Sequence, residues 1–272
     1  MEIVMKNAAD AFREEANRQR LTTGSRELDA LIDGIRQGEF HLFYGDDEEA
    51  LDLLIHRVLV NCTLPTERGG FAAKALYLNL CNYHKGKTIL DRDRLSLLSK
   101  HVGVEPSVAS ESILSVSFDE AEQLRATQEV SRLLGQNRDI GLLVVNNLVG
   151  SIETLRKPLE ARQILKQVVG MLKESATRNG LTVIVISSAL KGSKSRIPKP
   201  EGSALLFHEA NIIVFLRRVD VDGIHAIRAC LVKHPYKECL HSTTVYVSRG
   251  GIDLVGRITP HLNNSIMNRW KN

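Results

Sequence analysis

The chain has 272 residues, of which 43% are hydrophobic and 25% charged, and its net charge is +4. These values are ordinary for a globular protein with one large α/β domain or two small ones, and the mild positive charge does not by itself require a nucleic-acid partner. Four scattered cysteines, no secretory h-region and no apolar run of about 20 residues predict free thiols, no membrane helix and an intracellular location.

The first half of the chain alternates helices and strands. The polar stretch 7–20 is expected to form a short helix or an extended arm, and Ser25 is expected to cap a helix that stops at Gly34. The hydrophobic pattern then predicts strands at 40–44, 75–80 and 112–117 and helices at 50–62, 90–101 and 119–134.

The second half contains two continuous apolar strands, at 140–145 and 181–186, of the type buried on both faces of a parallel sheet. A helix at 159–178 lies between them, and a loop rich in Lys, Ser, Pro and Gly follows at 190–203. Strands at 212–216, 226–232 and 243–247 then run together, the last of them followed by glycines that close the core. This order predicts an α/β fold with a doubly wound, mostly parallel central sheet and antiparallel strands at its C-terminal edge. We assign 1–20 to an N-terminal arm, 21–255 to one core domain and 256–272 to a polar tail.

The strand at 40–44, a glycine turn and the following helix form the context of a phosphate-binding loop, which requires G-x-x-x-x-G-K-[ST]. Gly45 matches the first position, but Ala50 replaces the second glycine, Leu51 the lysine and Asp52 the hydroxyl residue. Acidic residues fill the intervening positions, where phosphates would lie: Asp46, Asp47, Glu48 and Glu49. Each acid can cap a backbone amide or favour the positive end of the helix dipole, so a triphosphate would meet like charge. On this stretch alone, an ordinary acidic helix N-terminus is the simpler interpretation.

The order of further motifs resembles the RecA/RadA recombinase superfamily, and within it the RadA-type ATPase core and its paralogues. The resemblance covers nearly everything from Met5 to Val255 and implies a RecA-like fold. It is carried in chain order by Leu21–Asp29, Val60–Gly70, Ser112–Gln123, Pro200–His208 and Tyr246–Asp253. We expect the family's separate N-terminal helix-hairpin-helix domain to be missing.

The resemblance also implies which positions would carry ATP hydrolysis. The acid that polarises the attacking water falls at Cys81, the Walker B aspartate that orders Mg²⁺ falls at Asn146, and the switch residue that senses the γ-phosphate falls near Ser188. Loss of the lysine, the metal-binding carboxylate and the activating acid together leaves little transition-state stabilisation. We therefore expect a degenerate ATPase that neither binds nor hydrolyses ATP at this site, with no catalytic residue, cofactor or metal. Misalignment by one or two residues would not restore the enzyme, because no Gly-Lys-Thr or Gly-Lys-Ser occurs near residue 45.

Cations gather where the family has its DNA-binding loops. The loop at 190–203 corresponds to the second such loop and carries Lys191, Lys194, Arg196 and Lys199, while Arg156 and Lys157 fall in the region of the first. These side chains would neutralise phosphates of single-stranded DNA in a salt-dependent, sequence-independent way. The alternative is a solvated surface loop, which the absence of an aromatic residue for base stacking favours.

Two segments resemble subunit contacts of the family. Met5-Lys-Asn-Ala8 is similar to the Phe-x-x-Ala polymerisation motif, which docks into a neighbouring core by adding a strand, and methionine keeps an apolar anchor at Met5 ahead of Ala8. The alternative is a disordered N-terminus. Lys233, His234 and Pro235 match the segment that caps a neighbour's nucleotide. Our hypothesis is that Lys233 reaches the γ-phosphate on an ATP-competent partner, the alternative being an exposed lysine in a turn.

The preferred interpretation is an ATPase-inactive recombinase paralogue. It would act as an accessory or mediator subunit in homologous recombination and DNA repair, binding a RadA-type recombinase or an active paralogue, and single-stranded DNA. One alternative is a weak or unconventional DNA-dependent ATPase in DNA repair. The other is a regulatory KaiC-like RecA-fold scaffold without DNA binding.

Overall fold

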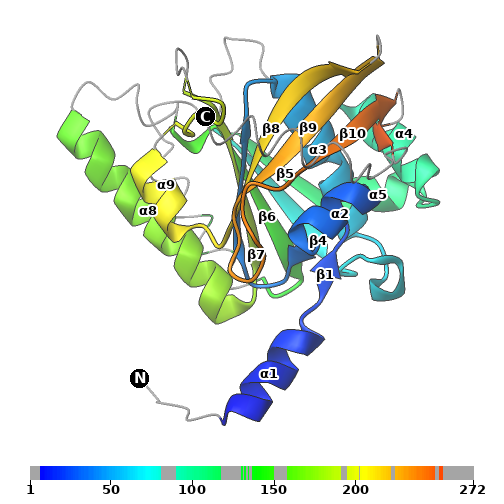
Figure 1. Cartoon of the computed structure of the whole chain (residues 1–272). Coiled ribbons are helices and arrows are strands. Elements are labelled where there is room, and N and C mark those ends of the chain that lie inside the picture. The colour runs from blue at the N-terminus through cyan, green and yellow to red at the C-terminus, as the bar shows by residue number, and fades with distance from the viewer. Residues whose placement is uncertain are drawn as a thin grey trace.

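A computed structural model gives the fold of the chain (Figure 1). It describes residues 7–80, 90–117, 137–149, 158–190, 195–201, 203–221, 224–248 and 251–253, together with Val130, Arg132 and Leu134.

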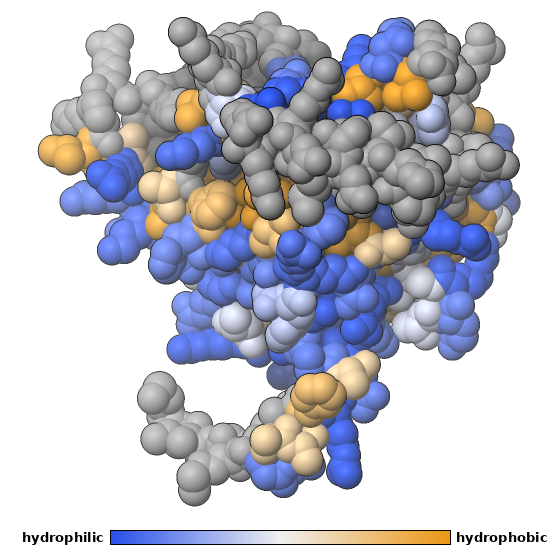
Figure 2. All heavy atoms as spheres, in the orientation of Figure 1, coloured by the Kyte–Doolittle hydropathy of each residue, from blue (hydrophilic) through white to orange (hydrophobic). Residues whose placement is uncertain are grey.

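The N-terminal elements lead from a projecting helix into the core. They are α1 (Ala8–Asn17), β1 (Arg20–Leu21), α2 (Arg26–Ile32) and β2 (Ile35–Arg36), with β1 and β2 paired antiparallel. The predicted cap of α2 is confirmed, because Ser25 Oγ accepts a hydrogen bond from Leu28 N at 3.2 Å. Helix α1 stands away from the body and shows apolar surface at the lower edge of the molecule (Figure 2), where Phe12 is 80% exposed.

In the described part of the chain, nine strands form the main sheet, in the order β11-β10-β9-β8-β3-β7-β6-β4-β5. Six neighbouring strands are parallel: β8 (Ile212–Val221), β3 (Phe40–Gly45), β7 (Thr182–Ser188), β6 (Ile140–Asn146), β4 (Lys74–Asn79) and β5 (Ile113–Ser117). The other three are added antiparallel at one edge: β9 (Ile224–Lys233), β10 (Ser242–Ser248) and β11 (Gly251–Asp253). The predicted mostly parallel sheet with an antiparallel C-terminal edge is confirmed.

Helices cover both faces of this sheet (Figure 1). One face carries α3 (Glu48–Cys62), the short 3-10 helix η1 (Thr66–Arg68), α4 (Arg92–His101) and α5 (Pro106–Ser112), and the other carries α8 (Pro158–Asn179) and α9 (Ser203–Glu209). Alternate residues of the central strands enter two separate cores. On β6, Val144 faces the α3 side while Val145 faces the α8 side, both fully buried. A strand buried on both faces is expected to be apolar at every position, as β3, β6 and β7 nearly are.

The structure also differs from the sequence-based prediction in its shorter elements. Helix α3 begins at Glu48 rather than at residue 50, because Asp47 supplies its cap. The two seven-residue helices α5 and α9 were not predicted, and α9 begins at Ser203, the last residue of an expected loop. The strand at 243–247 is not the last, since β11 pairs with it and begins at Gly251, one of the glycines that were expected to close the core. Most of the helix predicted at 119–134, and the tail at 256–272, lie outside the described residues.

Candidate functional site

Three of the positions singled out from the sequence meet at the carboxyl edge of the parallel strands. Gly45 at the end of β3 lies opposite Ser188 at the end of β7. Asn146 ends the next strand, β6, and pairs with Ile186 on β7 and Asn79 on β4. Open α/β sheets bind ligands at this edge. The positions that the resemblance assigns to the phosphate loop, Walker B and the switch therefore lie together at the edge where a ligand would bind. Cys81 lies outside the described residues.

The glycine at position 45 is explained by strand contact. A Cβ atom there would lie 2.4 Å from the carbonyl oxygen of Leu216 on the neighbouring strand β8. A side chain at this position would therefore push β8 away from β3. The close approach of β8 therefore accounts for a glycine at position 45.

Asp47 occupies the amides that a phosphate loop offers to its ligand. Its Oδ1 accepts hydrogen bonds from Glu49 N at 3.0 Å and from Ala50 N at 3.3 Å, which makes it the N-cap of α3. The first-turn amides of a helix have no partner within the helix and are the usual donors to a bound anion. Here a carboxylate of the same chain satisfies two of them.

Two arginines from β8 cover this acidic turn. Arg217 Nε lies 2.6 Å from Asp46 Oδ2, and its Nη1 donates to the carbonyl oxygen of Arg196 at 3.3 Å. Arg218 bridges Asp47 Oδ2 at 3.2 Å and Glu49 Oε2 at 3.0 Å. These ion pairs link the acidic turn in front of α3 to β8.

The next three positions of the phosphate-loop frame lead away from a nucleotide site. Ala50 and Leu51 are buried in the core on the α3 side of the sheet. Asp52 turns toward α4, where Arg94 Nη1 lies 2.5 Å from its Oδ2, and the buried ring of His56 lies 3.5 Å from its Oδ1. Burial raises the pKa of Asp52, although His56 and Arg94 act to lower it. Asp52 thus joins α3 to α4 and replaces the hydroxyl that would bind Mg²⁺ in a phosphate loop.

The Walker B and switch positions make neutral contacts. The Asn146 side-chain amide donates to the hydroxyl of Tyr77 at 3.0 Å. The Ser188 carbonyl accepts from Glu201 N at 3.0 Å, next to the isolated bridge between Ala189 and Pro200. An amide binds a hard divalent cation more weakly than a carboxylate does, since it contributes no charge.

The described half of the expected DNA-binding loop is anchored at the same edge. The Tyr44 hydroxyl donates to the Pro198 carbonyl at 3.0 Å, and Leu190 N donates to the Lys199 carbonyl at 2.8 Å. The side chains of Arg196 and Lys199 are exposed. The other cations predicted to contact DNA lie outside the described residues: Arg156, Lys157, Lys191 and Lys194.

The predicted partner segment has contacts inside its own chain. Lys233 Nζ donates to the carbonyls of Phe207 and His208 at the end of α9, at 3.0 and 2.9 Å. His234 is buried, with Nε2 3.1 Å from the Ile32 carbonyl, whereas Pro235 is exposed. Burial lowers the pKa of His234. Lys233 would have to leave two carbonyls to reach a neighbour's phosphate, so that hypothesis stays a prediction.

The N-terminal docking motif is only half described. Ala8 is the exposed first residue of α1, and Met5 lies outside the described residues. Docking through this pair also stays a prediction.

Sequence reasoning missed the cations that complete the site. Arg217 and Arg218 stand side by side in a strand that is otherwise apolar at its start, and this was the one available signal. Arg94 gave none, because it lies in a helix with many charged residues. In the described residues, no three His, Cys, Asp or Glu side chains are grouped to hold a metal ion. No described helix is long and apolar enough to cross a bilayer.

The sequence is similar to proteins that are named for DNA repair and recombination. The family model described as Rad51 matches residues 14–252. The chain is 26% identical over 227 residues to the DNA repair and recombination protein RadA of Metallosphaera sedula, covering 80% of this chain and 68% of that protein. It is 29% identical over 211 residues to DNA repair protein RAD51 homolog B of Zea mays, and 24% identical over 210 residues to DNA repair protein RAD51 of Mycosarcoma maydis. Each of these two matches covers 73% of this chain and 60% of the relative.

Proposed function

The chain belongs to the Rad51 family, and on this premise we propose that it is an ATPase-inactive accessory subunit of homologous recombination and DNA repair. It binds a RadA-type recombinase or an ATP-competent paralogue, and it contacts single-stranded DNA. Its relatives are DNA repair and recombination proteins by name, which supports the general role.

The observation that carries the proposal is the closed N-terminus of α3. A triphosphate would need the amides that Asp47 already occupies, and it would enter beside four acidic residues, three of which are paired with Arg217 or Arg218. Leu51 supplies no charge in place of the lysine. Phosphoryl transfer depends on positioning and on electrostatic stabilisation of the transferred group, and among the described residues of the phosphate-loop frame, 45–52, there is no cation.

The contacts of Arg217 also support the proposal that the expected DNA-binding loop, 190–203, is positioned without a bound nucleotide. Arg217 joins Asp46, at the phosphate-loop position, to the backbone of Arg196 in the loop. The link consists of side chains of this chain and needs no bound nucleotide. The described part of the loop, at Arg196, is therefore tied to the acidic turn by Arg217, which suits a subunit that supports a filament without turning over ATP.

The test of DNA contact is binding to a single-stranded oligonucleotide as a function of salt. Arg196→Gln with Lys199→Gln removes two exposed cations from the loop. If each contacts a phosphate, the slope of log K against log salt should fall by about 1.4, at roughly 0.7 per contact for single strands. Arg178→Gln with Lys166→Gln removes the same charge from the exposed side of α8 and should leave the slope unchanged.

The partner is tested by co-purification with a RadA-type recombinase from the same host, followed by ATPase assays of each protein and of the mixture. We expect a stable complex in which this chain alone hydrolyses no ATP. Hydrolysis by the isolated chain would support a DNA-dependent ATPase instead. A third outcome is that the chain binds the recombinase, but the loop double variant and the α8 double variant bind the oligonucleotide equally weakly. The chain would then be a scaffold without DNA contact.

A further inference from the structure

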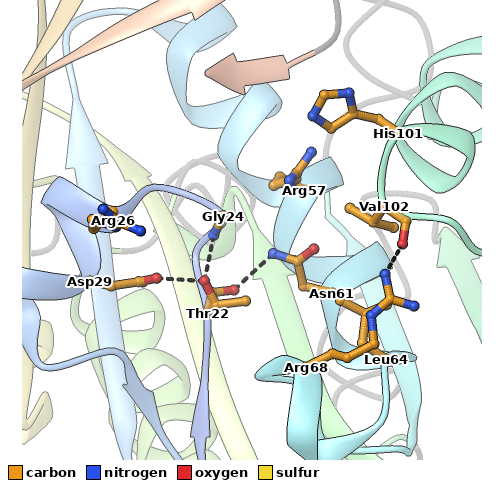
Figure 3. Close-up of a pocket in the computed structure, with 10 residues that line it drawn as sticks. All are labelled: Thr22, Gly24, Arg26, Asp29, Arg57, Asn61, Leu64, Arg68, His101 and Val102. Atoms are coloured by element: carbon orange, nitrogen blue, oxygen red, sulfur yellow. Dashed lines mark hydrogen bonds between the residues drawn. The ribbon is translucent and has the colours of Figure 1, made fainter. Parts of the chain in front are cut away.

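A second polar site lies at the other end of α3. A cavity of about 470 Å³ opens between the start of α2, the last turns of α3, η1 and the end of α4 (Figure 3). Arg57 and Asn61 line it, whereas Asp47 caps the opposite end of the helix. At 1.5 Å per residue, Asn61 lies about 20 Å along the axis from Asp47, so the two sites are separate.

Three arginines and a histidine, from four elements, surround this cavity (Figure 3). They are Arg26 from α2, Arg57 from α3, Arg68 from η1 and His101 from α4. The one acid in the lining is Asp29, whose carboxylate accepts from Thr22 Oγ1 at 2.5 Å and from Thr23 N and Oγ1 at 2.7 Å each. Because Asp29 is held by these threonines, the lining offers an incoming ligand mainly positive charge.

The walls of the cavity are built into the fold. Gly24 has φ +85°, and a Cβ atom there would lie 2.4 Å from Arg57 Nε, so a glycine is needed for the arginine to pass. Asn61 Nδ2 donates to the Thr22 carbonyl at 2.9 Å and ties α3 to the entry segment. An Arg68 guanidinium nitrogen donates to the Val102 carbonyl and ties η1 to α4. These contacts hold the cationic groups around a common space.

The chemistry of the lining identifies a class of ligand. Guanidinium groups present a planar fork of donors that matches phosphate oxygens, and arginine is favoured where such groups are recognised. The volume lies in the range of small-molecule pockets. An extended acidic peptide would instead need a groove along a strand or a helix. We propose that this cavity binds a small organic phosphate, of the size of pyrophosphate or a sugar phosphate, independently of the DNA loop and of the α3 N-terminus.

The experiment is calorimetric titration of pyrophosphate, without metal, into the full chain. We expect saturable binding at one site, weakened about tenfold by Arg26→Gln, as for loss of one charge-assisted hydrogen bond. Arg26 is exposed, so its substitution should leave the fold intact, and circular dichroism checks this. His101→Gln, at another exposed position of the lining, should also weaken binding. The matched control Arg178→Gln removes one exposed charge on α8 and should change the affinity less than twofold.

Several results would overturn the proposal. One is the absence of saturable heat, and another is an equal loss in Arg26→Gln and Arg178→Gln, which would indicate general charge attraction. Displacement of pyrophosphate by a glutamate-rich peptide at the same concentration would assign the cavity to a protein partner. A loss of oligonucleotide affinity in Arg26→Gln as large as the loss for pyrophosphate would assign it to DNA. We expect Arg26→Gln to leave oligonucleotide binding unchanged, which separates this inference from the proposed function.

Discussion

Asp47 is the residue whose replacement most directly probes the closed turn in front of α3. Its Oδ1 caps two amides of the helix, and its Oδ2 pairs with Arg218. Asp47→Asn keeps an oxygen that can cap the helix but loses the charge. Asp47→Ala loses both. The pair of variants therefore separates the cap from the ion pair.

The expected magnitudes follow from the two contacts. Loss of an N-cap costs about 1 kcal/mol on average. The ion pair adds about 0.5 kcal/mol at most, because the Arg218 side chain is 51% exposed and keeps its contact with Glu49. We expect the free energy of unfolding to fall by about 1.5 kcal/mol in Asp47→Ala and by about 0.5 kcal/mol in Asp47→Asn.

The assay is urea unfolding of the full chain at pH 7, followed by far-UV circular dichroism, with the slope m required to stay constant. Asp46→Asn is the matched control, since Asp46 pairs with Arg217 but caps no amide, and it should cost about 0.5 kcal/mol or less. If Asp47→Ala were no more destabilising than Asp47→Asn, Asp47 would not be the cap, and the amides would be open to an anion.

Three further predictions concern buried groups. Burial lowers the pKa of His41 to about 3, so below pH 6.5 the unfolded chain binds a proton at this residue and the folded chain does not. The free energy of unfolding should therefore fall by about 2 kcal/mol between pH 7 and 5. In His41→Leu this pH dependence should be weaker, and an unchanged pH dependence would contradict the reasoning. Burial raises the pKa of the Cys62 thiol to about 12, so iodoacetamide at pH 8 should label half-buried Cys239 well before Cys62. Peptide mapping measures the two labelling rates, and equal rates would contradict the burial of Cys62. The Arg36 side chain is 7% exposed, and its Nη1 lies 2.6 Å from Glu15 Oε1 on α1. Arg36→Gln should therefore lower the free energy of unfolding by about 2 kcal/mol and speed proteolysis within α1. An unchanged cleavage rate would mean that other contacts hold α1.

The long helices and strands of the core could be predicted from the sequence, because each is long enough for its hydrophobic pattern to be recognised. The apolar runs that became β6 and β7 can be satisfied only by burial on both faces, and Ser25 could be recognised as a cap from its neighbours. The seven-residue helices α5 and α9 are too short for a hydrophobic period to emerge, and both follow a proline or glycine that favours a loop.

The contacts that define the candidate site were beyond sequence reasoning because they join distant residues. Asp46 and Arg217 are 171 positions apart, and only the pairing of β3 with β8 brings them together. Asp52 stood in the frame of a phosphate loop, but its partner Arg94 arrives on α4, 42 positions later. The basic cavity likewise depends on four elements that meet on one flank of the sheet.

The measurement that decides whether this chain has a nucleotide site is calorimetric titration of Mg²⁺-ATP. It should be made on the chain carrying Arg26→Gln and Arg68→Gln, so that any binding in the basic cavity is weakened. We expect no saturable binding, because Asp47 occupies the α3 amides and Leu51 provides no cation. Saturable binding at one site would contradict the closed turn and would bring the ATPase interpretation forward.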